Sequence, residues 1–224
     1  MKNIKLNIVL MGAPGAGKGT QSEFIVKKYG ISHISTGDML REAMAEKTPI
    51  GLKAASYINS GALVPDDVVI AIVRERLSKP DCAKGYLLDG FPRTIAQAKA
   101  LKELTSEIGR PVQVALNLSV DESILISRIV SRRVCPKCGA SYNLLSKKPC
   151  KDDVCDTCGS ELVQRPDDTK EKFTTRLNAY NTSTKPLIDF YRDEGILSEI
   201  DGMADIDAIA KSISDSLEGS KFVR

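Results

Sequence analysis

The chain has 224 residues, of which 42% are hydrophobic, and its 32 basic and 29 acidic side chains give a formal net charge of +3. This length supports one substantial core, and the near balance of charge excludes a general attraction to nucleic acid or to a membrane surface. No apolar run approaches the roughly 20 residues of a membrane span or forms a secretory core, so we expect a cytoplasmic protein with small-molecule partners.

The first predicted strand, over residues 6–11, runs directly into a glycine-rich loop, Gly12-Ala-Pro-Gly-Ala-Gly-Lys-Gly-Thr20. No helix breaker follows over 18–29, which predicts a strand, a phosphate-binding loop and a helix N-terminus. Backbone N–H groups and the helix dipole would attract phosphates, and Lys18 would add an ammonium. A glycine precedes the hydroxyl of Thr20, so we do not expect direct magnesium ligation by this loop. The alternative is a glycine-rich turn with a solvated lysine.

The sequence pattern of residues 31–64 predicts a small helical insertion. A short strand is expected at 33–35, and it leads to Asp38 near a helix start. Apolar residues over 39–60 follow helical spacing, and Thr48-Pro49 interrupts that spacing. We therefore expect a helical insertion that is broken at Thr48-Pro49.

The next segment places an aspartate at a strand end. A helix is predicted over 65–78, and a short apolar strand over 85–89 then ends at Asp89. In a chain with a phosphate-binding loop, such an aspartate is expected to hold magnesium, directly or through its waters. The alternative is an aspartate that only completes a turn.

The remaining elements alternate between helix and strand. Helices are predicted over 94–108, 121–133, 168–180, 186–194 and 205–217, and strands over 112–118 and 196–200. This alternation predicts an α/β fold with a central parallel sheet of about five strands, helices on both sides, and a ligand crevice at the strand carboxyl ends. Arg128 and Arg132 are four residues apart and would share a helix face, where they could converge on one anion or form a solvated surface.

Five of the six cysteines lie between positions 135 and 158. Four of them form two knuckles, Cys135-Pro-Lys-Cys138-Gly and Cys155-Asp-Thr-Cys158-Gly. Each knuckle aims two sulfurs at one tetrahedral ion, so we predict structural zinc with four protein ligands and no open position for chemistry. Disulfides or free thiols are the alternatives. Cys150 has no knuckle partner and is a spare thiol, and Cys82 is expected to be a small buried residue.

Six motifs taken together resemble the adenylate kinases, in their long form with a zinc-bearing lid. They are Gly12–Gln21, Ile34–Arg41, Leu87–Arg93, Arg128–Val134, Arg165–Asp168 and Arg176–Tyr180. The match runs over nearly the whole chain, and Gly19-Thr20 is this family's own variant of the phosphate loop. The resemblance implies a P-loop three-layer fold whose core consists of 1–30, 65–130 and 169–224, with a segment at 31–64 that binds the nucleoside monophosphate and a zinc-ribbon-like lid at 131–168.

The resemblance also implies the reversible reaction of MgATP with AMP to give two ADP, in a monomer. The implied ATP contacts are Gly15, Ala16, Gly17, Lys18, Gly19, Thr20, Arg128, Arg132, Ser141, Tyr142 and Ala204. The implied AMP contacts are Thr36, Arg41, Ala62, Leu63, Val64, Gly90, Phe91, Pro92, Arg93, Gln97, Arg165 and Arg176.

The chemistry of this reaction calls for a cationic clamp. With magnesium, the expected clamp is Lys18, Arg93, Arg128, Arg132, Arg165 and Arg176. No general base is expected, because an AMP phosphate is already an ionised nucleophile. Asp167 and Asp168 are expected to orient lid arginines rather than to accept protons.

Two other functions compete with this interpretation. One is a kinase for another nucleoside monophosphate. The other is a nucleotide-gated zinc-ribbon protein that binds nucleic acid, whose insert should be basic and aromatic. Residues 135–168 contain one aromatic side chain, Tyr142, and mix their lysines with acidic residues, so nucleic acid is not an expected partner. The acidic residues are Asp152, Asp153, Asp156, Glu161, Asp167 and Asp168.

Overall fold

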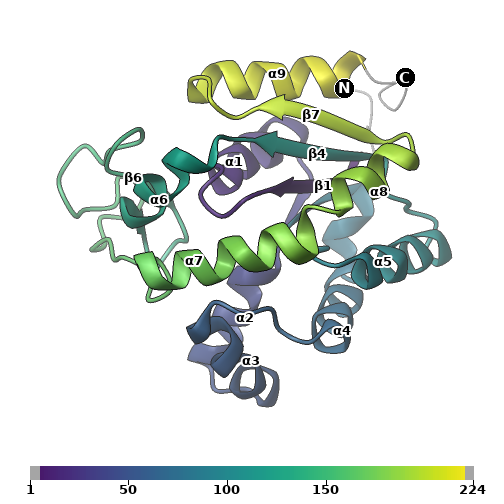
Figure 1. The fold of residues 1–224 in the computed structure, drawn as a ribbon, viewed down its shortest axis with the longest axis horizontal. Coiled ribbons are helices and arrows are strands. Elements are labelled where there is room, and N and C mark those ends of the chain that lie inside the picture. The colour runs from purple at the N-terminus through teal and green to yellow at the C-terminus, as the bar shows by residue number, and fades with distance from the viewer. Residues whose placement is uncertain (1–5, 220–224) are drawn as a thin grey trace.

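A five-stranded parallel sheet forms the centre of the computed structural model, which describes residues 6–219 (Figure 1). The strand order is β2-β3-β1-β4-β7, and every neighbouring pair is parallel. The strands are β1 (Leu6–Gly12), β2 (Ser32–Ser35), β3 (Gly85–Asp89), β4 (Val114–Ser119) and β7 (Leu197–Asp201). The α/β prediction with a parallel sheet of about five strands is confirmed.

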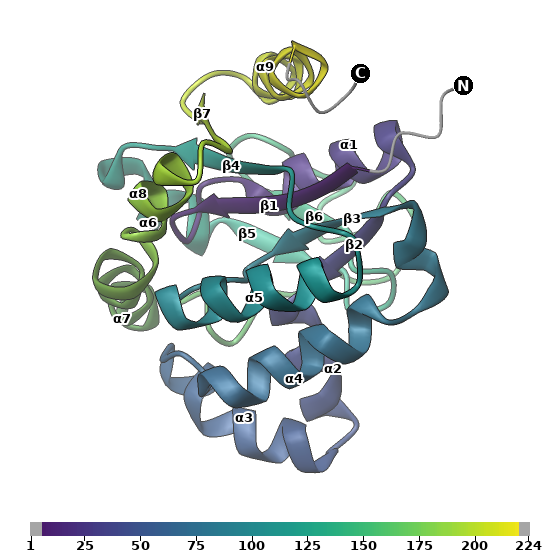
Figure 2. The ribbon, with the colours of Figure 1, turned by 90° about the vertical axis from the view of Figure 1, so that its right-hand side faces the viewer.

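Helices cover both faces of this sheet (Figures 1 and 2). The helices are α1 (Lys18–Tyr29), α2 (Thr36–Ala45), α3 (Pro49–Ser60), α4 (Asp66–Leu77), α5 (Ile95–Glu107), α6 (Glu122–Val130), α7 (Lys170–Ala179), α8 (Leu187–Asp193) and α9 (Ile206–Gly219). A short 3₁₀ helix, η1 (Pro80–Lys84), leads from α4 into β3, and the π-helical segment η2 (Tyr180–Thr184) joins α7 to α8. Within residues 6–219, no helix has the length and hydrophobicity that a membrane span requires.

The central strand β1 is buried along its whole length because its side chains alternate between two cores. Val9 packs with side chains of α4, α5 and α8, whereas Ile8 packs with side chains of α1 and α9. A parallel strand covered on both faces is expected to be apolar along most of its length, as β1 is. The exception is Asn7, which is buried and whose Nδ2 donates to the Pro111 carbonyl oxygen at 2.9 Å. The same burial fixes the loop that follows β1.

The break between α2 and α3 follows from local chemistry. Thr48 is the N-cap of α3, where its Oγ1 accepts a hydrogen bond from the Gly51 backbone N at 3.1 Å, and Pro49 is the first helical residue. A Cβ on Gly51 would lie 2.0 Å from the Ala43 carbonyl oxygen. The glycine therefore allows the two helices to pack closely. The predicted helical structure around the break at Thr48-Pro49 is confirmed, whereas the start of the segment 31–64 belongs to β2 of the central sheet.

One predicted helix is too long. Helix α6 ends at Val130, and Arg132 lies in β5 (Arg132–Val134), which pairs with β6 (Ser141–Asn143). The Val134 backbone N also donates to the Val163 carbonyl oxygen at 2.8 Å. Pairing with a segment about 30 residues away therefore prevails over the local helical pattern. The prediction that Arg128 and Arg132 share a helix face is wrong.

Candidate active site and cysteine insert

The loop between β1 and α1 has the backbone shape that phosphate binding requires. Gly15 and Gly17 have φ angles of 87° and 98°, in the left-handed region that favours glycine. The Lys18 Nζ folds back over the loop and donates to the carbonyl oxygens of Gly12 at 2.6 Å and Ala13 at 3.0 Å. The loop is thus curled around its own lysine at the N-terminus of α1.

Several cations lie close together at the carboxyl edge of the sheet. The pKa of Lys18 is lowered to about 8, mainly by burial and also by nearby arginines, Arg93 among them, which together outweigh the opposing charge of Asp89. Burial and the neighbouring Arg176 lower the pKa of Arg93 to about 10. Like charges that are partly removed from water repel one another, which favours an anion among them. This arrangement is suited to holding a polyphosphate.

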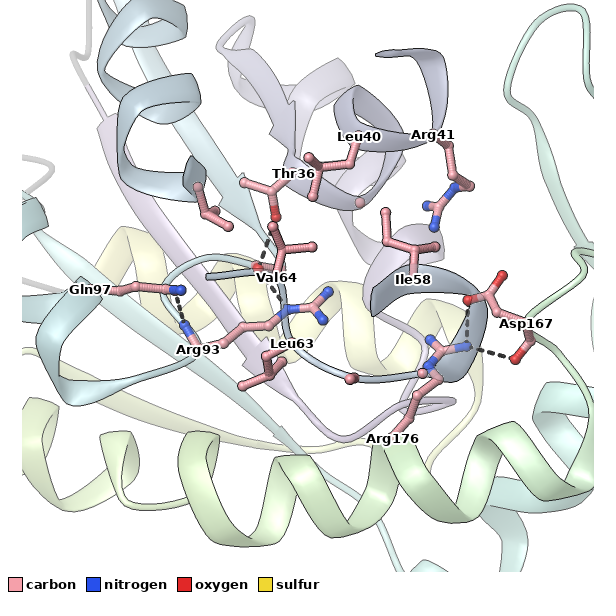
Figure 3. Close-up of a pocket in the computed structure, with 15 residues that line it drawn as sticks. Thr36, Leu40, Arg41, Ile58, Leu63, Val64, Arg93, Gln97, Asp167 and Arg176 are labelled. Atoms are coloured by element: carbon pink, nitrogen blue, oxygen red, sulfur yellow. Dashed lines mark hydrogen bonds and ion pairs between the residues drawn. The ribbon is translucent and has the colours of Figure 1, made fainter. Parts of the chain in front are cut away.

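A pocket lies between α2, α3 and the loop from β3 to α5 (Figure 3). Nine of the residues implied as AMP contacts line it, and they are Thr36, Arg41, Ala62, Leu63, Val64, Gly90, Arg93, Gln97 and Arg176. The pocket also has an apolar part that the sequence did not indicate, made of Leu40, Ile58 and Val69. Phe91 and Pro92 are buried and are not among the lining residues.

Arg93 is held in the pocket through its neighbours. Its Nε donates to the Gly90 carbonyl oxygen at 2.8 Å, and the Thr36 hydroxyl donates to the same oxygen at 2.9 Å. The Thr184 hydroxyl donates to the Arg93 carbonyl oxygen at 2.9 Å. These bonds occupy Nε and the backbone, so the terminal nitrogens of Arg93 are directed into the pocket (Figure 3).

Two adjacent aspartates bind arginines, as expected. Asp168 is fully buried and accepts two hydrogen bonds from Arg132 and one from Arg176 at 3.2 Å. Asp167 accepts from Arg176 at 2.9 Å. Burial raises the pKa of Asp167, but Arg176 and the arginines around it lower the pKa more, so Asp167 is ionised. Both carboxylates therefore accept hydrogen bonds from guanidinium groups and hold these groups in position.

Asp38 joins two segments that are far apart in sequence, a role that the sequence did not indicate. Its Oδ1 accepts from Arg41 at 2.6 Å and from Arg165 at 3.0 Å. Burial raises the pKa of Asp38, but Arg41 and Arg165 lower it to about 2, so the side chain is ionised at neutral pH. Asp38 therefore links α2 to the segment 131–168, which we call the cysteine insert.

Replacing Asp38 with asparagine is expected to weaken the contact between α2 and the cysteine insert. Without the carboxylate, Arg41 and Arg165 face each other with like charge. Because Asp38 is partly exposed to solvent, we expect a change on the order of 0.5–1 kcal/mol, seen as a two- to fivefold rise in amide hydrogen exchange around Arg165. Glu42→Gln, an exposed change on the same helix, is the control. Equal exchange in the two variants would contradict the role of Asp38.

The four knuckle cysteines come together in the cysteine insert. Their sulfur atoms all lie within 4.8 Å of one another, and the Cys135–Cys158 and Cys138–Cys155 pairs are 3.4 and 3.5 Å apart. A disulfide would need about 2.05 Å, and all four thiols are free. Zinc with Zn–S bonds of about 2.3 Å requires sulfurs about 3.8 Å apart. The donor set and its geometry therefore fit one tetrahedral zinc ion.

The two knuckles have the same backbone pattern, which explains why they face one ion. Gly139 and Gly159 donate to the carbonyl oxygens of Cys135 and Cys155 at 3.0 and 2.8 Å. The first cysteine of each knuckle also donates its backbone N–H to the residue five positions later, at 2.9 Å in both cases. Cys150 is exposed and lies outside the four-sulfur cluster, and Cys82 is buried.

The residues implied as ATP contacts outside the phosphate loop differ from one another in burial and in hydrogen-bond partners. The Tyr142 side chain is buried inside the cysteine insert, where its hydroxyl accepts from the Asp156 backbone N at 2.9 Å. The Arg128 guanidinium donates to the Gly202 carbonyl oxygen at 3.3 Å. Ser141 and Ala204 are not buried. Arg128 thus approaches the loop after β7, whereas the Tyr142 ring is enclosed within the cysteine insert.

Asp89 lies at the carboxyl end of β3, opposite Leu10 of β1. The Nε2 of His33, the only histidine in the chain, is 3.7 Å from its Oδ2. Burial raises the pKa of Asp89, but His33 and the charge of Lys18 lower it more. A single ionised carboxylate beside a phosphate loop fits magnesium that is held mainly by phosphates and water.

Comparison with known proteins agrees with this geometry. The family model described as adenylate kinase matches residues 10–196. The chain is 53% identical over 214 residues to the adenylate kinases of Bacillus mycoides (strain KBAB4) and Bacillus pumilus (strain SAFR-032). In each case the alignment covers 96% of this chain and 99% of the relative. A match of this extent, on a chain that has the phosphate loop and the four-cysteine insert, shows that the chain belongs to the adenylate kinase family.

Proposed function

We propose that the pocket between α2, α3 and the β3–α5 loop binds AMP while the phosphate loop binds MgATP. As a member of the adenylate kinase family, the chain transfers the terminal phosphoryl group of ATP to AMP and forms two ADP. The observation that carries the assignment of the pocket is its division into a cationic part, with Arg41, Arg93 and Arg176, and an apolar part, with Leu40 and Ile58. A nucleotide has this same division between phosphate and base.

The ATP site extends from the phosphate loop, residues 15–20, to Arg128 and Arg132. Asp89 would hold magnesium through its waters, and the ion would neutralise phosphate charge when bound. Ser141 and Ala204 would approach the base of ATP. Because the Tyr142 ring is buried in the cysteine insert, its contribution there would come from the backbone.

Catalysis in this site would be electrostatic. The transferring phosphoryl group spreads negative charge over its oxygens, and the clamp of Lys18 and five arginines is preorganised to stabilise that charge. Asp167 and Asp168 keep Arg132 and Arg176 in place. No side chain needs to accept a proton, since the attacking phosphate of AMP is already ionised.

The cysteine insert, 131–168, would act as a lid, and 31–64 would act as the segment that binds the monophosphate. A lid excludes water, which would otherwise compete with AMP as the acceptor. The remaining residues, 1–30, 65–130 and 169–224, would form the core together with β2, which belongs to the central sheet. Residues 1–5 and 220–224 of this division lie outside the described residues. Structural zinc would fix the internal shape of the lid while its two ends move.

We also propose that the enzyme works as a monomer in the cytoplasm. A four-thiolate zinc site is typical of a reducing compartment. Both proposed nucleotide sites are built from one chain, so neither requires a second copy. Sedimentation analysis of the purified protein would measure the oligomeric state.

The specificity of the acceptor site can be measured directly. AMP, GMP, UMP and CMP are supplied in parallel with MgATP, and ADP formation is followed in a coupled assay. We expect kcat/KM for AMP to exceed that for each other monophosphate by at least tenfold, since one good pair of base hydrogen bonds provides about 1–3 kcal/mol. A higher value for another monophosphate would reassign the enzyme's acceptor.

A further inference from the structure

Gln97 is a polar side chain in the first turn of α5 that is only 2% exposed and yet lines the pocket (Figure 3). Its Nε2 donates to Asp66 Oδ1 at 2.7 Å, and its Oε1 accepts from the Arg93 backbone N at 2.7 Å. The Thr94 hydroxyl donates to Asp66 Oδ2 at 2.9 Å and accepts from the Gln97 backbone N at 3.1 Å. Both oxygens of Asp66, the first residue of α4, are thus bonded to the start of α5.

This arrangement fixes the orientation of the Gln97 amide. A glutamine amide has two orientations of nearly equal shape, which exchange its oxygen and its NH₂ group. A carboxylate can only accept hydrogen bonds and a backbone N–H can only donate. Asp66 therefore requires the NH₂ group on its side, and Arg93 requires the oxygen on the other. Reversal would break both bonds and place like groups against each other.

The fixed amide keeps one N–H donor and one oxygen lone pair for a ligand. The pairing edge of adenine carries an amino group at position 6 beside the acceptor N1, and a glutamine amide can bind both atoms at once. A 6-oxopurine has a carbonyl at position 6 and an N–H at position 1, which is the reverse pattern. It would require the amide in the orientation that Asp66 opposes.

We propose that Asp66 is a positioning residue that holds the Gln97 amide in the orientation that selects adenine over 6-oxopurines. This inference rests on the proposed AMP site and adds the group that sets its base specificity. The free energy of discrimination arises because one purine leaves the buried polar groups paired and the other does not.

The test compares Asp66→Ala with the wild-type enzyme, using MgATP as donor and either AMP or inosine monophosphate as acceptor. Inosine monophosphate has the 6-oxopurine edge without an added amino group, so it isolates the hydrogen-bond pattern. We expect the ratio of kcat/KM for AMP to that for inosine monophosphate to fall about tenfold. A higher KM for AMP should account for most of the change, with kcat at saturating AMP largely retained. The ratio does not depend on the folded fraction, because both acceptors are assayed on one preparation.

Asp67→Ala is the matched control, because Asp67 occupies the same helical turn and is exposed. It should keep the wild-type ratio. In the Gln97→Ala background, Asp66→Ala should cause no further change, since the group that Asp66 orients is gone. If Asp66→Ala does not fold, Asp66→Asn should show a smaller fall in the ratio.

Two results would overturn the inference. The first is a wild-type ratio in Asp66→Ala, and the second is an equal fall in the presence and absence of Gln97. Failure of the proposed function would look different, because the wild-type enzyme itself would then not phosphorylate AMP.

Discussion

Arg93→Ala is expected to lower kcat by about 10³-fold or more, because one transition-state arginine contributes roughly 10³ to 10⁵ in related phosphoryl transfers. The Arg93 side chain points into the pocket from the β3–α5 loop, where its Nε is already bonded to Gly90 (Figure 3). Its remaining donors are therefore available to the phosphoryl group as negative charge develops. Steady-state kinetics with MgATP and AMP measure this loss.

The melting temperature should not fall with the activity. Burial and the neighbouring Arg176 lower the pKa of Arg93 to about 10, so the charged form is less favourable in the folded chain than in the unfolded chain. Removing this cation relieves repulsion, and we expect an unchanged or higher melting temperature. Arg93→Lys should remain strongly impaired, because an ammonium cannot reproduce the fork of a guanidinium.

Arg74→Ala is the control for Arg93→Ala. Arg74 is exposed on α4, where it lies 3.7 Å from Glu107, and an exposed pair of this kind contributes little. This variant should keep wild-type kinetics. Near-normal turnover in Arg93→Ala would remove Arg93 from the catalytic clamp, whereas a large fall in melting temperature would assign it a structural role.

Cys155→Ser is expected to abolish stable zinc binding and to unfold the cysteine insert. The small core of this insert consists of Cys135, Tyr142, Cys155 and Leu162, so two of its four buried residues belong to the four-sulfur cluster proposed to bind zinc. Zinc contributes about 10 kcal/mol or more to folding in small fingers, which a core of this size cannot replace. Activity should fall when the insert unfolds. The insert contains Arg165, and it contains Asp168, which holds Arg132 in place.

Three measurements on Cys155→Ser check this prediction: zinc content, melting temperature and limited proteolysis. We expect less than one zinc per chain, a lower first melting transition, and cleavage within 131–168. The sheet core should stay resistant, because it is formed by separate side-chain clusters on the two faces of the sheet.

Cys150→Ser is the matched control for the zinc prediction, because Cys150 belongs to the same insert but is exposed and outside the four-sulfur cluster. It should bind one zinc per chain and melt like the wild type. Full zinc content in Cys155→Ser would rule out the four-thiolate site. Loss of zinc in Cys150→Ser would show that the ligand set is different.

The sequence by itself determined the order of the elements and the chemistry that depends on neighbouring residues. The phosphate loop follows from an apolar strand that ends in glycines and Lys18, and its shape is set within a few residues. The zinc knuckles likewise follow from cysteine spacing, since each knuckle closes on itself through short-range hydrogen bonds. Such features depend on local backbone geometry, which the local sequence encodes.

The tertiary structure decided the features that join distant segments. Arg132 leaves the predicted helix because its strand pairs across the cysteine insert. Asp38 binds Arg165, which is 127 residues away, and Asp66 binds Gln97, which is 31 residues away. The Tyr142 side chain is buried against the knuckles. Periodicity and spacing describe only residues close in sequence. The contacts of Asp38 and Asp66 form where the parallel sheet brings several strand ends to one edge. Those of Arg132 and Tyr142 form where the cysteine insert folds on itself. In both places only the folded chain specifies which side chains meet.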